Sequence, residues 1–587
     1  LCLVVQASVG GWIDPDTDLK RVENITSFVD GRKHRLVFSD EFNVENRRFH
    51  DGSDPRWTAL NKDDYTNFAL HYYNHDLVKT SNGFLNISTI VEDVTFTVNN
   101  ANSKKKKSSK MTKNYQSAML QGWNKFCFTG GIVEISARLP GHAHTGGLWP
   151  AMWMMGNLAR ATYIGSSNNI WPWSADKCVR GKAQRQQYFS ACNSATHFGL
   201  NKYQGRGAPE IDILEAMPGF ENLHKNNPNT YTHLPYYSAS LQVSPGVEGY
   251  VPTSGELPSY AQWYSPHYLE YGPNTSLNIF FYGMHLEGVT PERSYSANAL
   301  SANRNIEKTH FETQHVYRLE WVKGEEGYLQ WHLDGELVYR IEAKALNITG
   351  AIIPEEPMYL LLNTAISSTW GFPAPCPEGC ACDCFDCREE KCACAVPHGM
   401  CENLPASMLI DYVRVYQAVG DDNQTVGCSI PSHPTKTFIE AHPDLYKNEW
   451  DEVPLKAVQR GGGSCVYHHE CSGHSSSSRT ETSDHNINDN SGSKHVRAHT
   501  ESDFVEDSPN RSAYNSNDKV DRGSCVRGRC QCSSNDYTGP YCLAANAFND
   551  IVYDEDPDFI VSFMMIPHSL IYISAVGLAL LVVLGVW

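Results

Sequence analysis

The 587-residue sequence lacks two features that mark common classes of protein. It has no long amphipathic helical pattern, so we do not expect a helical bundle. It also lacks an excess of positive charge, because 48 Lys and Arg stand against 66 Asp and Glu, a formal net charge of −18. Nucleic acids are bound through clustered positive charge, so this balance argues against a nucleic-acid partner.

The sequence has instead many short apolar segments separated by Gly, Pro and Asn, a pattern that predicts an all-β sandwich. The chain is longer than one ordinary domain and long enough to bury a large core. Asp334-Gly335, at the end of an alternating segment, predicts a tight hairpin. The segments that we expect to be strands are 146–156, 210–215, 315–321, 328–333, 360–365 and 408–416.

The most informative segment is Glu210-Ile211-Asp212-Ile213-Leu214-Glu215. On a regular strand Glu210 and Asp212 share a face, whereas Glu215 points the other way. A β-bulge adds one residue and would bring Glu215 back to the first face. Three carboxylates held on one face suit a retaining glycosidase, whose nucleophile and acid lie about 5–5.5 Å apart. From these six residues alone, a strand with a solvated acidic face is the alternative.

Several aromatic and glycine-rich segments surround this motif. Trp149 and Trp153 are four residues apart on an expected strand, so they share a face. They either belong to the core or form a flat platform on which the faces of sugar rings stack.

Taken together, these segments resemble glycoside hydrolase family 16, the β-jelly-roll endoglucanases and transglycosylases. The resemblance runs from about Leu36 to Tyr416 and rests on four segments besides the acidic motif. These are Leu36–Phe42, Trp149–Trp153, Glu320-Trp321 and Asp411–Tyr416. Within that family, three further segments resemble the fungal β-glucan-synthesis-associated SKN/KRE branch, namely Met119–Gly131, Met155–Arg160 and Gly207–Pro209.

The resemblance implies a concanavalin-like β-jelly-roll over residues 36–417 and assigns roles to the three acids. Glu210 would be the nucleophile, Glu215 the acid and base, and Asp212 the residue that hydrogen-bonds the nucleophile. No cofactor or metal is expected. The candidate substrate-binding residues are Trp123, Trp149, Trp153, Asn363 and Trp370. The tryptophans among them could instead be core residues.

Nineteen cysteines indicate an oxidising compartment. Eight lie in 376–401, an expected insert, where disulfides are favoured over a zinc site. Cys178 and Cys192 bracket a loop and are expected to pair. A third group, over 465–542, resembles an EGF-like module of unknown partner, interrupted by an expected disordered insertion at 472–522. Its cysteines are Cys465, Cys471, Cys525, Cys530, Cys532 and Cys542.

The two ends of the sequence suggest passage through the secretory pathway. Residues 1–10 resemble the remnant of a signal peptide. Residues 559–587 contain no Asp, Glu, Lys or Arg and are expected to form a transmembrane helix, with a GPI signal as the alternative. We therefore expect a single-pass membrane protein whose catalytic domain is lumenal or extracellular. The glycosylation sequons are Asn24, Asn86, Asn274, Asn347, Asn423 and Asn510.

Three functions remain compatible with the sequence. The first is a membrane-anchored β-glucan transglycosylase or remodelling protein of cell-wall biosynthesis, which the synthesis-branch segments and the expected anchor favour. The second is a β-1,3-glucan endohydrolase, a laminarinase. The third is a non-catalytic β-glucan-binding surface protein, which the intact acids Glu210, Asp212 and Glu215 disfavour.

Overall fold

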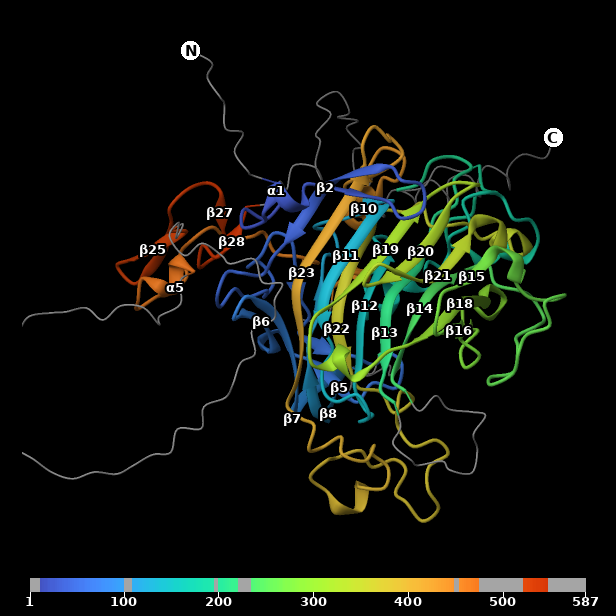
Figure 1. Ribbon diagram of the computed structural model, residues 1–587, viewed down its shortest axis with the longest axis horizontal. Helices are drawn as coiled ribbons and strands as arrows, with labels where there is room; N and C mark the ends of the chain where they lie inside the picture. Colours follow the sequence, from blue (N-terminus) through green and yellow to red (C-terminus); the bar gives the residue numbers. More distant parts are fainter. Residues whose placement is uncertain are drawn as a thin grey trace, which may run out of the picture. The chain divides into compact units, whose positions relative to one another are not determined.

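The computed structural model describes residues 11–99, 108–194, 199–219, 234–447, 453–473 and 521–546. These residues form mainly β-structure, and two large sheets stack face to face, which confirms the predicted β-sandwich (Figure 1). The strands pair antiparallel, except that β5 pairs parallel with β8.

The first sheet has 13 strands, and its long central strands lie side by side in Figure 1. Its path runs through β15 (Leu269–Tyr271), β21 (Glu336–Glu342), β20 (Tyr328–Leu333), β19 (His315–Val322), β11 (Gly131–Arg138), β23 (Ala406–Ala418), β7 (Phe84–Asn99), β8 (Ser108–Ser117), β5 (His71–Tyr73) and β4 (Lys62–Asp63). Beside this path lie β1 (Asn24–Thr26), β2 (Lys33–Asp40) and β6 (Val78–Ser81).

The second sheet has 11 strands and carries the acidic motif at its centre. Its path runs through β16 (Thr275–Leu277), β18 (Tyr295–Asn305), β14 (Tyr236–Val243), β13 (Glu210–Met217), β12 (Trp149–Gly156), β22 (Met358–Ala365), β10 (Phe128–Thr129) and β24 (Thr425–Val426). Beside it lie β3 (Thr58–Ala59), β9 (Met119–Gln121) and β17 (Gly283–Leu286).

The main apolar core lies between the two sheets. From the first sheet it includes Val133, Leu319 and Trp331, and from the second Ile211 and Leu360, all at most 1% exposed. Each strand contributes alternate residues, as its period of two requires. The second sheet therefore has one face in this core and one opposite face, which carries the candidate site.

The strands expected from the sequence are present. Segments 146–156, 210–215, 315–321, 328–333, 360–365 and 408–416 correspond to β12, β13, β19, β20, β22 and β23. The hairpin is also confirmed, because Leu333 pairs with Glu336 and the two turn residues have positive φ, 49° at Asp334 and 85° at Gly335. Such angles are those of the tight turn that Asp-Gly favours.

Helices are short in the part of the chain that the structure describes. The α-helices are α1 (Leu19–Val22), α2 (Ile164–Ser167), α3 (Lys182–Gln186), α4 (Thr435–Ala441) and α5 (His469–Ser472). The 3₁₀ turns are η1 (His75–Leu77), η2 (Pro266–Tyr268), η3 (Pro291–Arg293), η4 (Lys308–Phe311), η5 (Ala343–Ile348), η6 (Glu390–Cys392) and η7 (Pro443–Leu445).

Among the described residues, no helix is both long and apolar enough to cross a membrane. The expected signal remnant at 1–10 and the expected transmembrane helix at 559–587 both lie outside those residues, as does most of the expected disordered insertion at 472–522.

Nine disulfides join 18 of the 19 cysteines, in keeping with a protein of the secretory pathway. The expected Cys178–Cys192 pair is confirmed. The eight cysteines of 376–401 pair among themselves, as expected, in the bonds 376–382, 380–394, 384–392 and 387–401.

The C-terminal cysteines form a small disulfide-rich segment of their own. They pair as 465–525, 471–530 and 532–542, beside the short strands β25 (Gly523–Val526), β26 (Arg529–Cys532), β27 (Tyr537–Thr538) and β28 (Ala544–Ala545). Its EGF-like character stays a prediction.

Candidate active site

The predicted β-bulge is present in β13. The register of β13 shifts against both neighbours: Asp212 pairs with Trp153 of β12 and Leu214 with Met152, so Ile213 is the extra residue. Ile213 and Leu214 both enter the core, and Glu215 returns to the face of Glu210 and Asp212. The three acids therefore share what we call the site face, the face of the second sheet turned away from the main core.

The bulge is fixed from the opposite sheet. The indole Nε1 of Trp331, on β20, donates a hydrogen bond of 3.0 Å to the main-chain oxygen of Asp212. A bulge interrupts the hydrogen-bond ladder, and a buried carbonyl without a partner is costly. Trp331 removes that cost and couples the position of the acids to the main core.

Glu210 accepts hydrogen bonds from two neutral donors outside its own strand. Nε1 of Trp171 lies 2.7 Å from its Oε2, and Nε2 of Gln242, on β14, lies 2.6 Å from its Oε1. The same Gln242 nitrogen lies 3.1 Å from Oδ2 of Asp212. Asp212 is almost fully buried and shares a further hydrogen bond with Glu210.

Glu215 lies beside a pair of stacked tryptophans. Nε1 of Trp149 donates to its Oε1 at 3.1 Å. The ring of Trp149 stacks on that of Trp370, with centroids 4.3 Å apart and planes 4° from parallel. Trp370 is held in turn by a bond of 3.0 Å from its Nε1 to the main-chain oxygen of Ala216.

Burial raises the pKa of all three carboxyl groups. The pKa of Glu210 rises to about 8 through burial and the proximity of Glu215, while bonds from Trp171, Asp212 and Gln242 oppose the rise. The pKa values of Asp212 and Glu215 lie well above their usual range, again mainly through burial. Asp212 donates its proton to Glu210, which favours a neutral Asp212 beside an ionised Glu210.

Within the described residues, no Lys or Arg forms an ion pair with Glu210, Asp212 or Glu215. Hydrogen bonds from neutral groups are therefore the means by which this site favours one ionised carboxyl. Glu210 has the most such donors, so it ionises before Asp212 and Glu215 as the pH rises. Once the pH exceeds the Glu210 pKa of about 8, the arrangement supplies one carboxylate and two carboxylic acids on one face.

Two other predicted site residues lie next to the acids. Nε1 of Trp153 donates to Oδ1 of Asn363 at 2.8 Å, and Nδ2 of Asn363 donates to the hydroxyl of Tyr73 at 3.4 Å. Asn363 pairs with Ala151, which in turn pairs with Glu215, so it lies two strands from that acid on the same face. Trp149, Trp153, Asn363 and Trp370 are thus brought together with the acids.

Trp123 is not brought to this group. It has no exposed surface, its ring stacks on Tyr446, and its Nε1 bonds the main-chain oxygen of Asn157. It belongs to a second apolar cluster that covers one end of the site face. Trp123 therefore offers no ring face to a sugar. It is a core residue, which was the alternative stated for the tryptophans.

This second cluster is built largely from the segment 157–209, between β12 and β13, and from residues 428–446. Close backbone contacts hold the segment 157–209 to the sheet. A Cβ on Gly207 would lie 2.1 Å from the oxygen of Trp173, and one on Gly156 would lie 2.6 Å from Cα of Ala208. Only glycine fits at such distances, which explains both glycines in the segments that carry the family resemblance.

The second covering segment is tied to the sandwich by the Cys127–Cys428 disulfide. Sequence reasoning did not find this pair, because 301 residues separate the two cysteines. Sequence reasoning also missed Trp171 and Gln242, which no spacing rule connects to the acidic motif. Trp171 lies 39 residues before Glu210, and Gln242 lies 32 residues after it.

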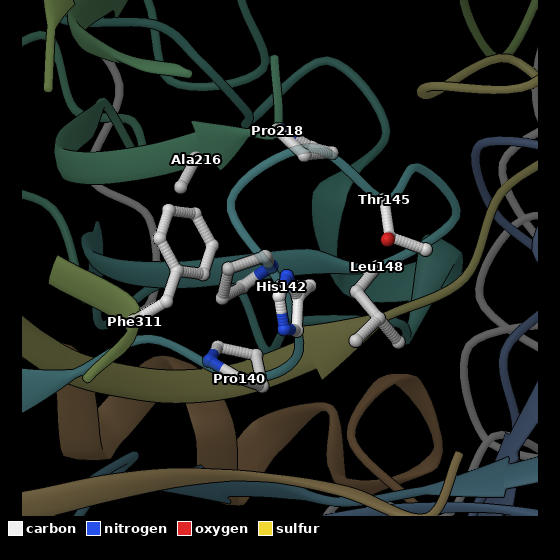
Figure 2. Close-up of a pocket in the computed structure, with 8 residues that line it drawn as sticks. Pro140, His142, Thr145, Leu148, Ala216, Pro218 and Phe311 are labelled. Atoms are coloured by element: carbon white, nitrogen blue, oxygen red, sulfur yellow. The ribbon is translucent and has the colours of Figure 1, made fainter. Parts of the chain in front are cut away.

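A small cavity lies at the end of β13, beyond Glu215 (Figure 2). Its lining includes Ala216, Pro218, Phe311, His142 and Leu148, and Figure 2 shows the Phe311 ring directed toward Ala216. Its volume of about 10 Å³ is no more than one water molecule requires. It is too small for a sugar ring.

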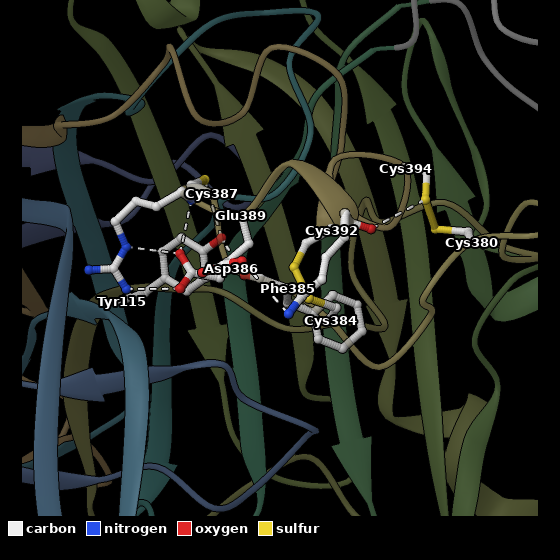
Figure 3. Close-up of a disulfide and its surroundings, with 11 residues drawn as sticks. Tyr115, Cys380, Cys384, Phe385, Asp386, Cys387, Glu389, Cys392 and Cys394 are labelled. Atoms are coloured by element: carbon white, nitrogen blue, oxygen red, sulfur yellow. Dashed lines mark hydrogen bonds and ion pairs between the residues drawn. A yellow bond between two sulfur atoms is a disulfide. The ribbon is translucent and has the colours of Figure 1, made fainter.

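The cysteine-rich insert is anchored close to this end of the site. The hydroxyl of Tyr115, on β8, donates to the main-chain oxygen of Phe385 at 2.6 Å, beside Cys387 (Figure 3). Arg388 forms ion pairs with Asp93 and with Asp386. The insert follows Trp370 in the chain after five residues, so its anchoring constrains the segment that carries that ring.

Fold and site together define a β-sandwich protein with a bulged carboxyl triad on an aromatic-lined face. The family model for "Beta-glucan synthesis-associated protein SKN1/KRE6/Sbg1" matches residues 3–374 and 398–453 of this chain. The chain belongs to this family, which confirms the resemblance drawn from the sequence. The unmatched residues 375–397 contain seven of the eight cysteines of the cysteine-rich insert.

Two curated relatives illustrate the match. Beta-glucan synthesis-associated protein KRE6 of Saccharomyces cerevisiae is 30% identical over 467 residues, covering 74% of this chain and 53% of that protein. Beta-glucan synthesis-associated protein SKN1 of Candida albicans is 30% identical over 480 residues, covering 77% and 53%. The chain therefore spans about half the length of the curated relatives it matches.

Solved structures give a more distant likeness. An endo-β-1,3-glucanase from Pyrococcus furiosus is 18% identical, with a TM-score of 0.35, and the match covers 68% of this chain and 99% of that one. LamAcat from Zobellia galactanivorans is 22% identical, with a TM-score of 0.34 and coverage of 65% and 97%.

Proposed function

We propose that this protein is a retaining β-glucan transglycosylase or remodelling enzyme of β-glucan biosynthesis. The observation that carries the proposal is the bulge at Ile213, which gathers Glu210, Asp212 and Glu215 on one face in unequal environments. Family membership supports β-glucan as the substrate, since the relatives are described as associated with β-glucan synthesis.

In the first half of the proposed reaction, a carboxylate oxygen of Glu210 attacks the anomeric carbon of a β-linked glucose unit. The bond from that carbon to the glycosidic oxygen breaks, and Glu215 gives its proton to the departing oxygen. The high pKa of Glu215 supports this role, because the group must keep its proton near neutral pH.

In the second half, Glu215 takes a proton from the hydroxyl of an acceptor. That oxygen attacks the anomeric carbon and releases Glu210 as a carboxylate. An acceptor sugar gives transfer, and water gives hydrolysis. Trp149 and Trp370, stacked beside Glu215, offer a flat aromatic surface where an acceptor sugar could bind, which favours transfer.

Asp212 would act through Glu210. It is buried, keeps its proton and donates a hydrogen bond to the nucleophile, which stabilises the carboxylate form. Trp153 and Asn363 continue the surface on the other side of β12 and would contact the glucan. No step of this mechanism calls for a metal or a cofactor.

A laminarinase, which transfers the glucosyl group to water, is the second candidate. One experiment separates the two: the purified protein is incubated with oligosaccharides of laminarin and the products are resolved by size. Products longer than the substrate indicate transfer, shorter products alone indicate hydrolysis, and unchanged substrate supports a non-catalytic binding protein.

We also propose that the chain is membrane-anchored, with the sandwich on the lumenal or extracellular side where its disulfides form. Deletion of residues 559–587 should release the protein into the medium. Retention on the membrane would show that this segment is not the anchor.

A further inference from the structure

The segment 157–209 brings a tryptophan to the candidate nucleophile. Trp171 is partly exposed on the site face, and its Nε1 donates to Oε2 of Glu210 at 2.7 Å. No other residue of this segment bonds any of the three acids in the part of the chain that the structure describes. The contact is therefore a specific link between the covering segment and the acidic motif.

Several contacts hold Trp171 in place. Its main-chain N–H donates to the oxygen of Ser167 at 2.8 Å, and its main-chain oxygen accepts from the hydroxyl of Tyr295 at 2.5 Å. Its neighbour Ile170 accepts from the N–H of Ala208, which leads directly into β13. Contacts of its main chain with both the covering segment and β18 thus fix the position of the indole.

The surroundings of Glu210 make this donor important. The titratable groups that face it are Asp212 and Glu215 on β13 and Tyr359 on β22. All three are acids, so none of them offers a compensating positive charge. The ionised form of Glu210 depends on the hydrogen bonds of Trp171, Gln242 and Asp212.

We propose that Trp171 is a positioning residue for Glu210, whose indole N–H orients the carboxylate and favours its ionised form at the moment of attack. The inference rests on the proposed function, in which Glu210 is the nucleophile. It adds that the covering segment 157–209 contributes to glycosyl transfer through Trp171, besides covering one end of the sheet.

The test measures the ionisation of Glu210 in two ways, of which only one requires activity. The first is the pH profile of kcat/KM on laminarin oligosaccharides. The second is the pH dependence of the melting temperature. For the parent protein and for each variant, we take the difference in melting temperature from the same protein that also carries Glu210→Gln. This difference isolates the titration of Glu210, whether or not the protein is an enzyme.

For Trp171→Phe, which keeps an aromatic ring and loses the N–H, we expect both midpoints to move up by about one pH unit. Below the midpoint, kcat/KM should fall by about tenfold and recover as the pH rises. Tyr188→Phe is the matched control, because Tyr188 lies on the same segment, is 40% exposed and contacts none of the acids. It should leave both midpoints unchanged.

Tyr295→Phe provides a second variant should Trp171→Phe fold poorly. It keeps the indole and removes one contact that positions it, so we expect a smaller shift in the same direction. If the stability midpoint is the same in the parent protein and in a folded Trp171→Phe or Tyr295→Phe variant, the proposal is overturned. A shifted stability midpoint in a protein without glycosyl transfer would support the contact and refute the proposed function instead.

Discussion

The rings of Trp149 and Trp370 stack with centroids 4.3 Å apart, although 221 positions separate them in the chain. Trp149 also donates to Glu215, so the stack fixes the donor that faces the proposed acid and base. Removal of one ring should therefore affect both the aromatic surface and the orientation of Glu215.

We expect Trp370→Ala to lower kcat/KM for β-glucan oligosaccharides by about 2–10-fold, since an aromatic pair contributes about 0.5–1.5 kcal/mol beyond its buried area. Trp370→Phe keeps a ring that can stack and loses the hydrogen bond to the main-chain oxygen of Ala216. Its kcat/KM should therefore lie between those of the parent protein and Trp370→Ala. Steady-state kinetics measure the effect. An alanine variant as active as the parent would show that this stack takes no part in binding.

The acids themselves should respond unequally. Glu215→Gln should lower kcat by about 10²–10⁴-fold, the usual contribution of a general acid. Asp212→Asn should cost less, about 10–100-fold, because it alters one hydrogen bond to the nucleophile. Small nucleophiles such as azide should partly rescue a glycosyl-enzyme that lacks its general base. Equal losses in both variants would contradict the separate roles given to these two residues.

Glu210 should also give the protein a characteristic pH dependence of stability. Its pKa is raised from 4.5 to about 8, so between these values the folded protein keeps a proton that the unfolded chain has lost. The contribution of Glu210 to the free energy of unfolding is therefore fully present below pH 4.5. It declines as the pH rises toward 8, by about 1.4 kcal/mol per pH unit.

Glu210→Gln removes this dependence. We expect its melting temperature to exceed that of the parent by more at pH 7.5 than at pH 5, while catalytic activity is lost. Thermal denaturation at several pH values checks this. A constant difference across that range would show that Glu210 ionises normally in the folded protein.

Much of the site could be predicted from the sequence because its information is local. The alternation of Glu210, Asp212 and Glu215 with apolar residues specifies one strand, and the position of Glu215 requires a bulge. Cys178 and Cys192 were also predictable, because only 14 positions separate them.

What could not be predicted depends on tertiary contact. Trp171 contacts the acidic strand from a covering segment, and Trp331 contacts it from the opposite sheet. No local sequence pattern predicts either contact. Trp123 shows the converse. Its sequence context resembles that of a family member, yet it is completely buried within the second apolar cluster, and only the folded chain shows that Tyr446 stacks on its ring.

The cysteine-rich insert offers a chemical prediction. Because its eight cysteines are paired among themselves, alkylation of the unreduced protein should label none of them, and metal analysis should find no stoichiometric zinc. Mass spectrometry of peptides from 376–401 measures both the pairing and the label. Zinc removed only by chelators, with free thiols left behind, would contradict these disulfides.

The central claim is that this site transfers a β-glucosyl group by two successive displacements. The most direct measurement is proton NMR of the anomeric configuration formed first when the purified protein acts on laminarin oligosaccharides. Our account predicts a product that initially retains the β configuration and that disappears in Glu210→Gln. An initial α product, or a β product that persists in Glu210→Gln, would contradict it.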